Sequence, residues 1–255
     1  MMNNKFTITV YIILFGILFF SLNGCKDENP KPTDTIKTKG ILTLQFSHTV
    51  DGTSLTKNSA TYFTNAAGNE FNVSTFRYYI SNVELTKLDG SKVFYPIYKL
   101  IDAFDESTQT ITLLEVPNGD YKAISYFIGI DSTRNHSGPQ EGDLSATTGM
   151  LWTWTSGYLF LKLEGFYKDG ASQTSYRYHI GTDEFLNKVT SPISYSIQGT
   201  QKNAFMVCNL AEFFKNPTTF DIKIKDDIQS FPNEKQEAGQ LAANMADMIT
   251  VLKIE

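Results

Sequence analysis

Both tryptophans of the chain stand in the stretch GMLWTWTSGY, residues 149–158, which runs directly into the strand-like segment Tyr158 to Phe166. Side chains alternate between the two faces of an extended segment, so Trp152 and Trp154 would point to the same side. Two interpretations are open at this point. The pair could plug one end of a β-sheet core, as aromatic residues at strand spacing commonly do, or it could belong to a binding site.

On both sides of this stretch the chain continues as short alternating segments separated by turns. Residues 41–48 place Leu42, Leu44, Phe46 and His48 on one face of an extended segment. Leu241, Met245 and Met248 stand at helical spacing within residues 234–249, the one clear helix candidate. The pattern predicts an all-β, sandwich-like single domain with a short C-terminal helix. Residues 62–71 read as a short strand, a glycine turn and a returning strand. Further expected strands are residues 76–85, 93–101 (with Pro96 favouring an edge or a bulge), 110–114, 121–130, 176–182, 193–197, 205–210 and 220–224.

Residues 1–24 have the features of a secretory signal peptide. A short basic start is followed by an apolar run from Phe6 to Leu22, and small residues precede Cys25. The ending Leu22-Asn23-Gly24-Cys25 resembles a bacterial lipobox, which implies that Cys25 is lipidated and becomes the first residue of the mature protein. The other interpretation is a transmembrane helix, for which the apolar run is barely long enough.

Residues 25–40 form a polar, proline-bearing segment that cannot bury a core, so we expect a flexible tether ahead of a domain at residues 41–255. Lys26-Asp27-Glu28 resembles the charged export signal of surface lipoproteins of the bacteroidete group. The resemblance implies an outer-membrane lipoprotein, exposed at the cell surface or otherwise facing the periplasm.

Charge and cysteine content exclude several classes of function. The net charge is −5, and loss of the leader removes one basic residue, Lys5, and no acidic one, which makes it −6. An acidic chain without a basic cluster argues against a nucleic-acid partner. Cys25 and Cys208 are the only cysteines, so the mature domain cannot form an internal disulfide. Cys208 could be a soft metal ligand or a small buried apolar residue.

Catalytic motifs are not found. The chain has no glycine-rich phosphate loop, no His-Glu-x-x-His and no Gly-x-Ser-x-Gly. Asp102, Asp105 and Glu106 could in principle supply a glycosidase pair, but no aromatic sugar platform stands beside them, which favours a solvated turn. The sequence therefore predicts a protein that is not an enzyme.

The chain has three histidines, His48, His136 and His179. Neutral imidazole is the commonest side-chain ligand of borderline metals, and copper can be held by two or three histidines with a weak extra ligand such as Met150. The three residues are far apart in sequence, so only folding could bring them together. The other interpretation is that they are unrelated histidines of a β-domain.

Several short motifs occur in a set order along the chain: YISNVEL at 79–85, GDY at 119–121, FIGID at 127–131, NH at 135–136, GMLWTWTSGY at 149–158 and HIG at 179–181. Together they resemble the MbnP-like family of secreted copper-binding proteins associated with methanobactin, over about residues 41 to 255. The resemblance implies a periplasmic or surface β-domain that binds copper through histidines. It also implies a tryptophan that a partner dihaem enzyme related to MauG can oxidise to kynurenine.

Carried over by residue, the family motifs imply His136 and His179 as copper ligands, with His48 as the third candidate. They imply Trp152 or Trp154 as the oxidised position. After HIG the chain continues Thr182-Asp183-Glu184-Phe185, where methanobactin-linked members tend to place a cysteine, so the link to methanobactin stays open.

The leading hypothesis is therefore a non-enzymatic copper-binding surface lipoprotein. The alternative is a cell-surface accessory module that binds carbohydrate or a protein partner. That alternative expects both tryptophans on one flat, partly exposed face without a histidine beside them. A weak redox enzyme would in addition need an open coordination position at the metal.

Overall fold

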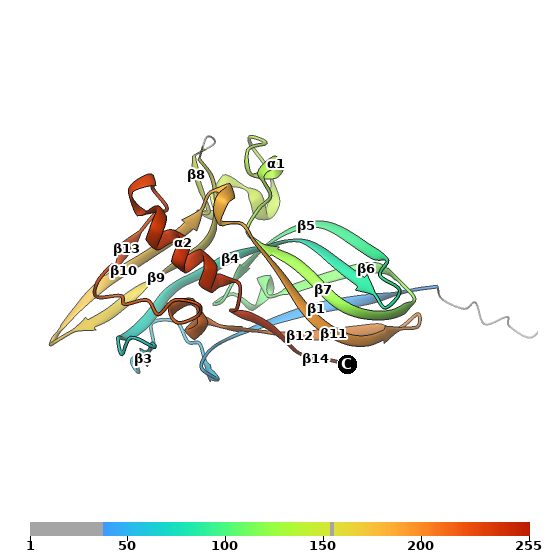
Figure 1. The fold of residues 1–255 in the computed structure, drawn as a ribbon, viewed down its shortest axis with the longest axis horizontal. Helices are drawn as coiled ribbons and strands as arrows, with labels where there is room; N and C mark the ends of the chain where they lie inside the picture. The colour runs from blue at the N-terminus through green and yellow to red at the C-terminus, as the bar shows by residue number, and fades with distance from the viewer. Residues whose placement is uncertain (1–37, 154–155) are drawn as a thin grey trace, which may run out of the picture. The chain divides into compact units, whose positions relative to one another are not determined.

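The computed structural model describes residues 38–153 and 156–255 (Figure 1). The expected signal peptide, the expected lipidation site Cys25 and the expected tether up to residue 37 lie outside the described residues, as does Trp154. Strand β1 begins at Lys39, two residues before the expected start of the domain. Among the described residues, no helix is long and apolar enough to span a membrane.

The domain is built from two β-sheets, which confirms the expected all-β, sandwich-like class (Figure 1). The larger sheet has the order β11-β7-β4-β9-β10-β13, with β3 and β5 also paired to β4 and β8 paired to β9. The smaller sheet has the order β14-β12-β1-β2, with β6 paired to β1. The strands of the larger sheet are β3 (Phe63–Thr64), β4 (Glu70–Lys87), β5 (Lys92–Asp102), β7 (Gly119–Ile128), β8 (Leu151–Thr153), β9 (Gly157–Asp169), β10 (Ser172–Gly181), β11 (Asn187–Ile197) and β13 (Asp227–Ile228).

The strands of the smaller sheet are β1 (Lys39–Val50), β2 (Thr53–Ser54), β6 (Thr110–Pro117), β12 (Gln201–Asn209) and β14 (Ile249–Ile254). The α-helices are α1 (Ser132–Asn135) and α2 (Lys235–Met245). Short 3-10 turns are η1 (Glu106–Thr108), η2 (Gly142–Leu144), η3 (Ala146–Thr148), η4 (Asp183–Phe185), η5 (Leu210–Phe214) and η6 (Pro232–Glu234).

Alternation along β1 sets the inner face of the smaller sheet as expected. Leu42 and Leu44 are fully buried, and Phe46 and His48 are nearly so. One apolar cluster contains residues of both sheets, and its largest members include Tyr78 and Tyr178 of the larger sheet with Phe213 and Phe214 of η5. The burial of this cluster is the main source of stability of the fold.

The interpretation of Pro96 is confirmed. Within the described chain β5 pairs only with β4, and the register between these two strands shifts next to Pro96, between the pairs Ser81–Tyr98 and Val83–Tyr95. A proline cannot donate a ladder hydrogen bond, so an edge strand with a bulge is where it costs least.

Two expected elements differ from the structure. Residues 220–224 form a turn instead of a strand, because the Asp221 carboxylate accepts the backbone N–H of Lys223 and the Asp221 carbonyl accepts that of Ile224. The C-terminal helix ends at Met245 and does not reach residue 249. Ile249 starts β14 and pairs with Cys208, so the backbone from this residue on belongs to the smaller sheet and not to the helix.

A second, smaller apolar cluster positions the candidate site. Tyr78 belongs to the main core, whereas its neighbour Tyr79 packs with Met150, Tyr158 and Phe160. Adjacent residues of a strand face opposite sides, so this second cluster lies on the other face of the larger sheet. The segment that joins β7 to β9 covers it, and Figure 1 shows α1 and β8 of this segment projecting together from that sheet.

Candidate functional site

A cavity of about 740 Å³ opens between four segments of the chain. Its wall includes His136 after α1, Trp152 of β8, Thr182 and Asp183 after β10, and Phe231 ahead of α2. Long-range packing therefore joins the asparagine-histidine motif, the tryptophan motif and the segment after HIG in one place. We call it the His136 cavity.

Asp183 is the polar centre of the cavity wall. Its carboxylate accepts hydrogen bonds from the Ser132 hydroxyl and from Nδ2 of Asn135, the latter at 2.8 Å. Nε2 of His136 lies 3.2 Å from both carboxylate oxygens. Partial burial opposes ionisation, but the hydrogen bonds from Ser132 and Asn135 outweigh it and lower the pKa of Asp183. The side chain is therefore a carboxylate at neutral pH.

Asn135 joins the histidine loop to the tryptophan hairpin. Its side chain is buried, its Oδ1 accepts the backbone N–H of Tyr158 at 2.8 Å, and its Nδ2 donates to Asp183. Gly157 lies directly against this amide: a Cβ at that position would be 2.3 Å from Asn135 Oδ1. The chain therefore needs glycine at 157 both for this close approach and for its φ of +80°.

Trp152 lies against the end of β10. A Cβ on Gly181 would be 2.8 Å from Cζ3 of the indole, so the ring occupies the space that a side chain would take. The ring also packs against the second apolar cluster, and its Nε1 is buried without a hydrogen-bond partner. Trp152 therefore both packs against the second apolar cluster and forms part of the cavity wall.

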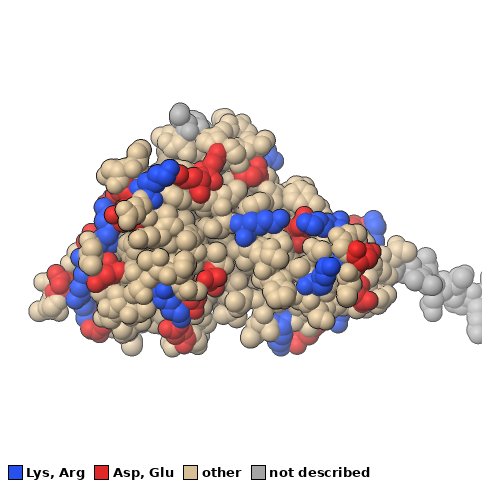
Figure 2. Space-filling view, in the orientation of Figure 1, with Lys and Arg blue, Asp and Glu red and all other residues tan. Residues whose placement is uncertain are grey.

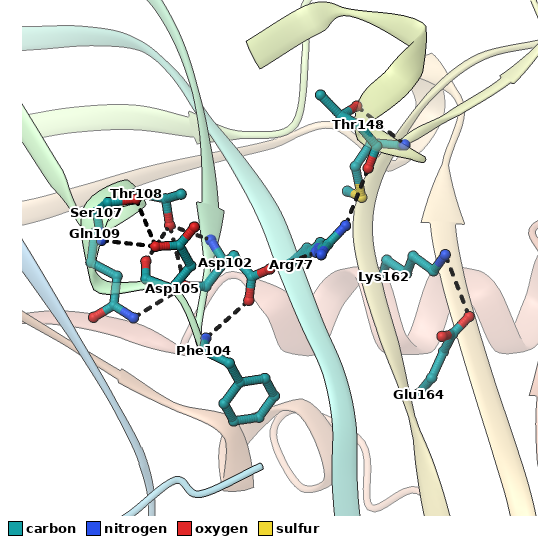
Figure 3. Close-up of polar contacts among 11 residues, drawn as sticks. Arg77, Asp102, Phe104, Asp105, Ser107, Thr108, Gln109, Thr148, Lys162 and Glu164 are labelled. Atoms are coloured by element: carbon teal, nitrogen blue, oxygen red, sulfur yellow. Dashed lines mark hydrogen bonds and ion pairs between the residues drawn. The ribbon is translucent and has the colours of Figure 1, made fainter. Parts of the chain in front are cut away.

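His179 sits on β10, opposite Lys162 of β9. Its Nε2 lies 2.8 Å from Oε1 of Glu164, and its carbonyl accepts the hydroxyl of Ser230, a residue of the cavity wall. The hydrogen bond from His179 outweighs the opposing effect of burial and lowers the pKa of Glu164 to about 2. The Lys162 ammonium lies 3.6 Å from Oε1 of Glu164 and also lowers the pKa of this carboxyl (Figure 3).

His48 has a different environment from the other two histidines. It is buried between the sheets, its Nε2 is 3.0 Å from the Tyr78 hydroxyl, and the rings of Phe76 and Tyr78 meet its imidazole edge to face. Burial lowers the pKa of His48 from 6.5 to about 4, against a smaller opposing effect of Asp102. His48 is not part of the His136 cavity wall.

We expect His48 to make stability depend on pH. Below pH 6.5 the unfolded chain binds a proton at this ring and the folded chain does not, so the free energy of unfolding falls as pH falls from 6.5 towards about 4. The total loss is about 3 kcal/mol, at about 1.4 kcal/mol per pH unit. Denaturant unfolding of the parent and of His48→Gln across this range isolates the effect, because all other groups titrate in both. Equal pH slopes in the two proteins would show that His48 does not titrate in this way.

Among the described residues, no group of three or more His, Cys, Asp and Glu side chains is arranged to hold a metal. The three histidines are thus not gathered around one point, although His136 shares its cavity with Trp152. Met150 is fully buried in the second apolar cluster. Cys208 is fully buried in the main core, where burial raises the pKa of its thiol to about 12, as expected for a small buried apolar residue.

The carboxylates of residues 102–106 form a capped turn. Asp105 accepts the backbone N–H of Ser107 at the start of η1, and Asp102 binds Arg77 at 2.7 Å and the backbone N–H of Phe104 (Figure 3). Arg77 also donates to the carbonyl of Thr148, which ties this turn to the segment that leads into β8. These contacts support the interpretation as a structural turn.

Sequence reasoning missed the parts of the cavity wall that follow β10 and precede α2, among them Asp183 and Phe231. Asp183 drew attention only because it stands where a cysteine was expected, and Phe231 lies in a stretch without any motif. An aspartate four residues after a motif histidine is a weak signal for a carboxylate partner, and nothing in the local pattern of Phe231 marks it.

Comparisons with known proteins agree with the motifs. The family model MbnP matches residues 39–235. The solved structure of MbnP from Methylosinus trichosporium is similar in fold, with a TM-score of 0.52 and 14% sequence identity, over 78% of this chain and 86% of that one. Among curated proteins no match is found.

Proposed function

Because this chain belongs to the MbnP family, we propose that it binds copper at the His136 cavity and acts as a copper carrier or buffer without being an enzyme. One observation supports the proposal most directly: Nε2 of His136 faces the Asp183 carboxylate in a cavity whose wall includes Trp152. Imidazole nitrogen is a suitable copper ligand, and a carboxylate can orient the ring that supplies it. Two of the motifs that carry the resemblance, the asparagine-histidine pair and the tryptophan stretch, contribute residues to this cavity.

His136 and His179 share one arrangement, which supports them as the ligands. In each ring Nε2 faces a carboxylate, Asp183 for His136 and Glu164 for His179. Metal-binding histidines usually donate one ring N–H to a carboxylate, which orients the ring and leaves the other nitrogen to bind the metal. We therefore propose Nδ1 of His136 as the copper-binding atom in the cavity, and Nδ1 of His179, which lies outside the cavity wall, as the candidate second ligand. His48 instead contacts a tyrosine hydroxyl inside the core and is the weakest of the three candidates.

The proposal includes modification of a tryptophan and a lipid anchor. By family resemblance, Trp152 or Trp154 is the position that a MauG-related dihaem partner enzyme oxidises to kynurenine. Cys25 would carry the lipid that holds the protein at the outer membrane, at the cell surface or facing the periplasm. Basic and acidic side chains are interspersed on the face that Figure 2 shows, in keeping with a protein that does not bind nucleic acid.

The alternative is an accessory module that binds carbohydrate or a protein partner. It expected the tryptophans on a flat, partly exposed face without a histidine nearby. Trp152 instead packs against an apolar cluster and shares a cavity with His136, so the geometry favours the copper hypothesis.

Metal and mass analysis of the mature protein from its native host tests the proposal. We expect copper at one equivalent per chain. A mass gain that matches conversion of tryptophan to kynurenine, localised to the peptide with Trp152 and Trp154, would support the dihaem partner as well. Copper without this gain would leave a plain histidine site. Absence of copper, together with no uptake from solution, would refute the proposal and favour the accessory module.

A further inference from the structure

The His136 cavity is much larger than a metal ion needs. Its volume of about 740 Å³ lies within the range typical of pockets for small organic molecules. Such pockets are mostly apolar with a few polar groups, and here Trp152, Phe231 and Pro232 form the apolar part of the wall. A copper ion with its ligands would leave most of this space unused.

Two polar atoms at the wall have no partner. Nε1 of Trp152 and Oγ1 of Thr182 are buried and lack a hydrogen bond, and only the hydroxyls of Tyr95 and Tyr195 share this condition in the part of the chain that the structure describes. Buried polar groups are nearly always paired in native proteins, so an unpaired one calls for an explanation. A bound ligand that carries a hydrogen-bonding group is one such explanation for the two atoms at this wall.

The backbone of the same wall is strained. Thr182 has φ +74° and ψ 146°, and Ser230 has φ +55°. A β-branched residue at positive φ is a rare outlier, and such outliers cluster at sites that bind ligands. The strain falls on the same residue as the unpaired Thr182 hydroxyl. Two independent observations therefore point to this segment of the wall.

The rim of the cavity indicates the charge and shape of the ligand. The side chains of Lys235 and Glu184 form an ion pair with each other, and the carboxylate of Asp183 is taken up by His136, Asn135 and Ser132. These residues therefore present no unpaired charge to a ligand, which favours a neutral molecule. Phe231 is 50% exposed, so its ring offers apolar surface beside the cavity.

We propose that the His136 cavity binds a flat, neutral aromatic molecule that carries a hydrogen-bond acceptor. The ring packs on Phe231 and Pro232, and the acceptor pairs with Nε1–H of Trp152, because an indole can only donate. Nε1 is buried in the ligand-free wall, so the proposal requires a small rotation of the indole about its side-chain bonds when the ligand binds. This inference goes beyond the copper site and does not depend on it, since the organic ligand fills the cavity without metal.

Quinoline and naphthalene form a matched pair of probes for this proposal. Both are flat, neutral and of nearly the same shape, but only quinoline has a ring nitrogen that accepts a hydrogen bond. The unmodified mature protein is titrated with each probe in the presence of excess EDTA, and the indole N–H signals are followed by heteronuclear NMR. Trp154→Phe assigns the signal of Trp152. We expect saturable binding of both probes, tighter for quinoline, with a downfield shift of the Trp152 N–H signal for quinoline alone.

Two variants of similar exposure separate the cavity from the general surface. Phe231 and Phe94 are 50% and 57% exposed, and Phe94 lies on the edge strand β5. We expect Phe231→Ser to weaken quinoline binding about tenfold, because the apolar area that the ligand covers is lost, and Phe94→Ser to leave it unchanged. Thermal melting of both variants confirms that they fold.

The proposal fails if quinoline does not bind saturably, or if Phe94→Ser weakens it as much as Phe231→Ser. Equal affinity for naphthalene without a shift of the Trp152 signal would overturn the assignment of the acceptor. Because EDTA is present throughout, none of these outcomes depends on whether the protein binds copper.

Discussion

Replacing His136 with alanine is expected to lower copper affinity at least about a hundredfold while the fold is retained. Among the described residues, this side chain is the only imidazole in the wall of the His136 cavity. Its loss would remove a proposed copper ligand, whereas loss of an outer partner alone typically costs 10- to 100-fold. The side chain is 42% exposed, so its removal leaves no buried void. Competition titration with a copper chelator of known affinity measures the change.

Asp183→Asn is the matched variant for this experiment. The amide keeps the size of the side chain and an oxygen for the Asn135 contact, but it removes the charge that orients His136 and favours its metal-bound form. A fall of about tenfold in copper affinity, smaller than for His136→Ala, is the expected result. His179→Ala tests the second proposed ligand in the same assay. If His136→Ala and His179→Ala both bind copper like the parent, the assignment of the site is wrong.

Asn135→Ala is expected to destabilise the domain by about 3 kcal/mol and to weaken copper binding as well. The substitution leaves the buried N–H of Tyr158 without its acceptor and removes a donor from Asp183. The histidine loop and the tryptophan hairpin then lose the contact that joins them. Denaturant unfolding measures the first effect, and the copper titration measures the second.

Gly157→Ala approaches the same contact from the other side. Its methyl group would lie 2.3 Å from Asn135 Oδ1, whereas at Gly170 the same group would meet open space. Both glycines have positive φ, +80° and +64°, so both variants carry a cost of about 1 kcal/mol for the backbone. Gly157→Ala should lose clearly more stability than Gly170→Ala and should resemble Asn135→Ala in copper binding. Equal losses in the two glycine variants would show that the Asn135 contact is not important.

Local pattern was a reliable guide where one face of a strand is buried. The inward set of β1 and the edge position of the proline-bearing β5 follow from alternation and from the missing N–H of Pro96. The expected strand at residues 220–224 was wrong although Phe220 and Ile222 are buried, because the Asp221 side chain competes for the backbone and makes a turn.

The sequence by itself determined the all-β class, the family and the residues of the asparagine-histidine and tryptophan motifs, because periodicity and short motifs are local properties of the chain. Only the tertiary structure decided that His136 meets Asp183, 47 residues away, and that His48 lies in the core instead. Such contacts depend on strand pairing and on packing over the second apolar cluster. The void that Gly181 leaves for Trp152 depends on them in the same way. The number of residues between two motifs does not determine how close they lie in the folded protein.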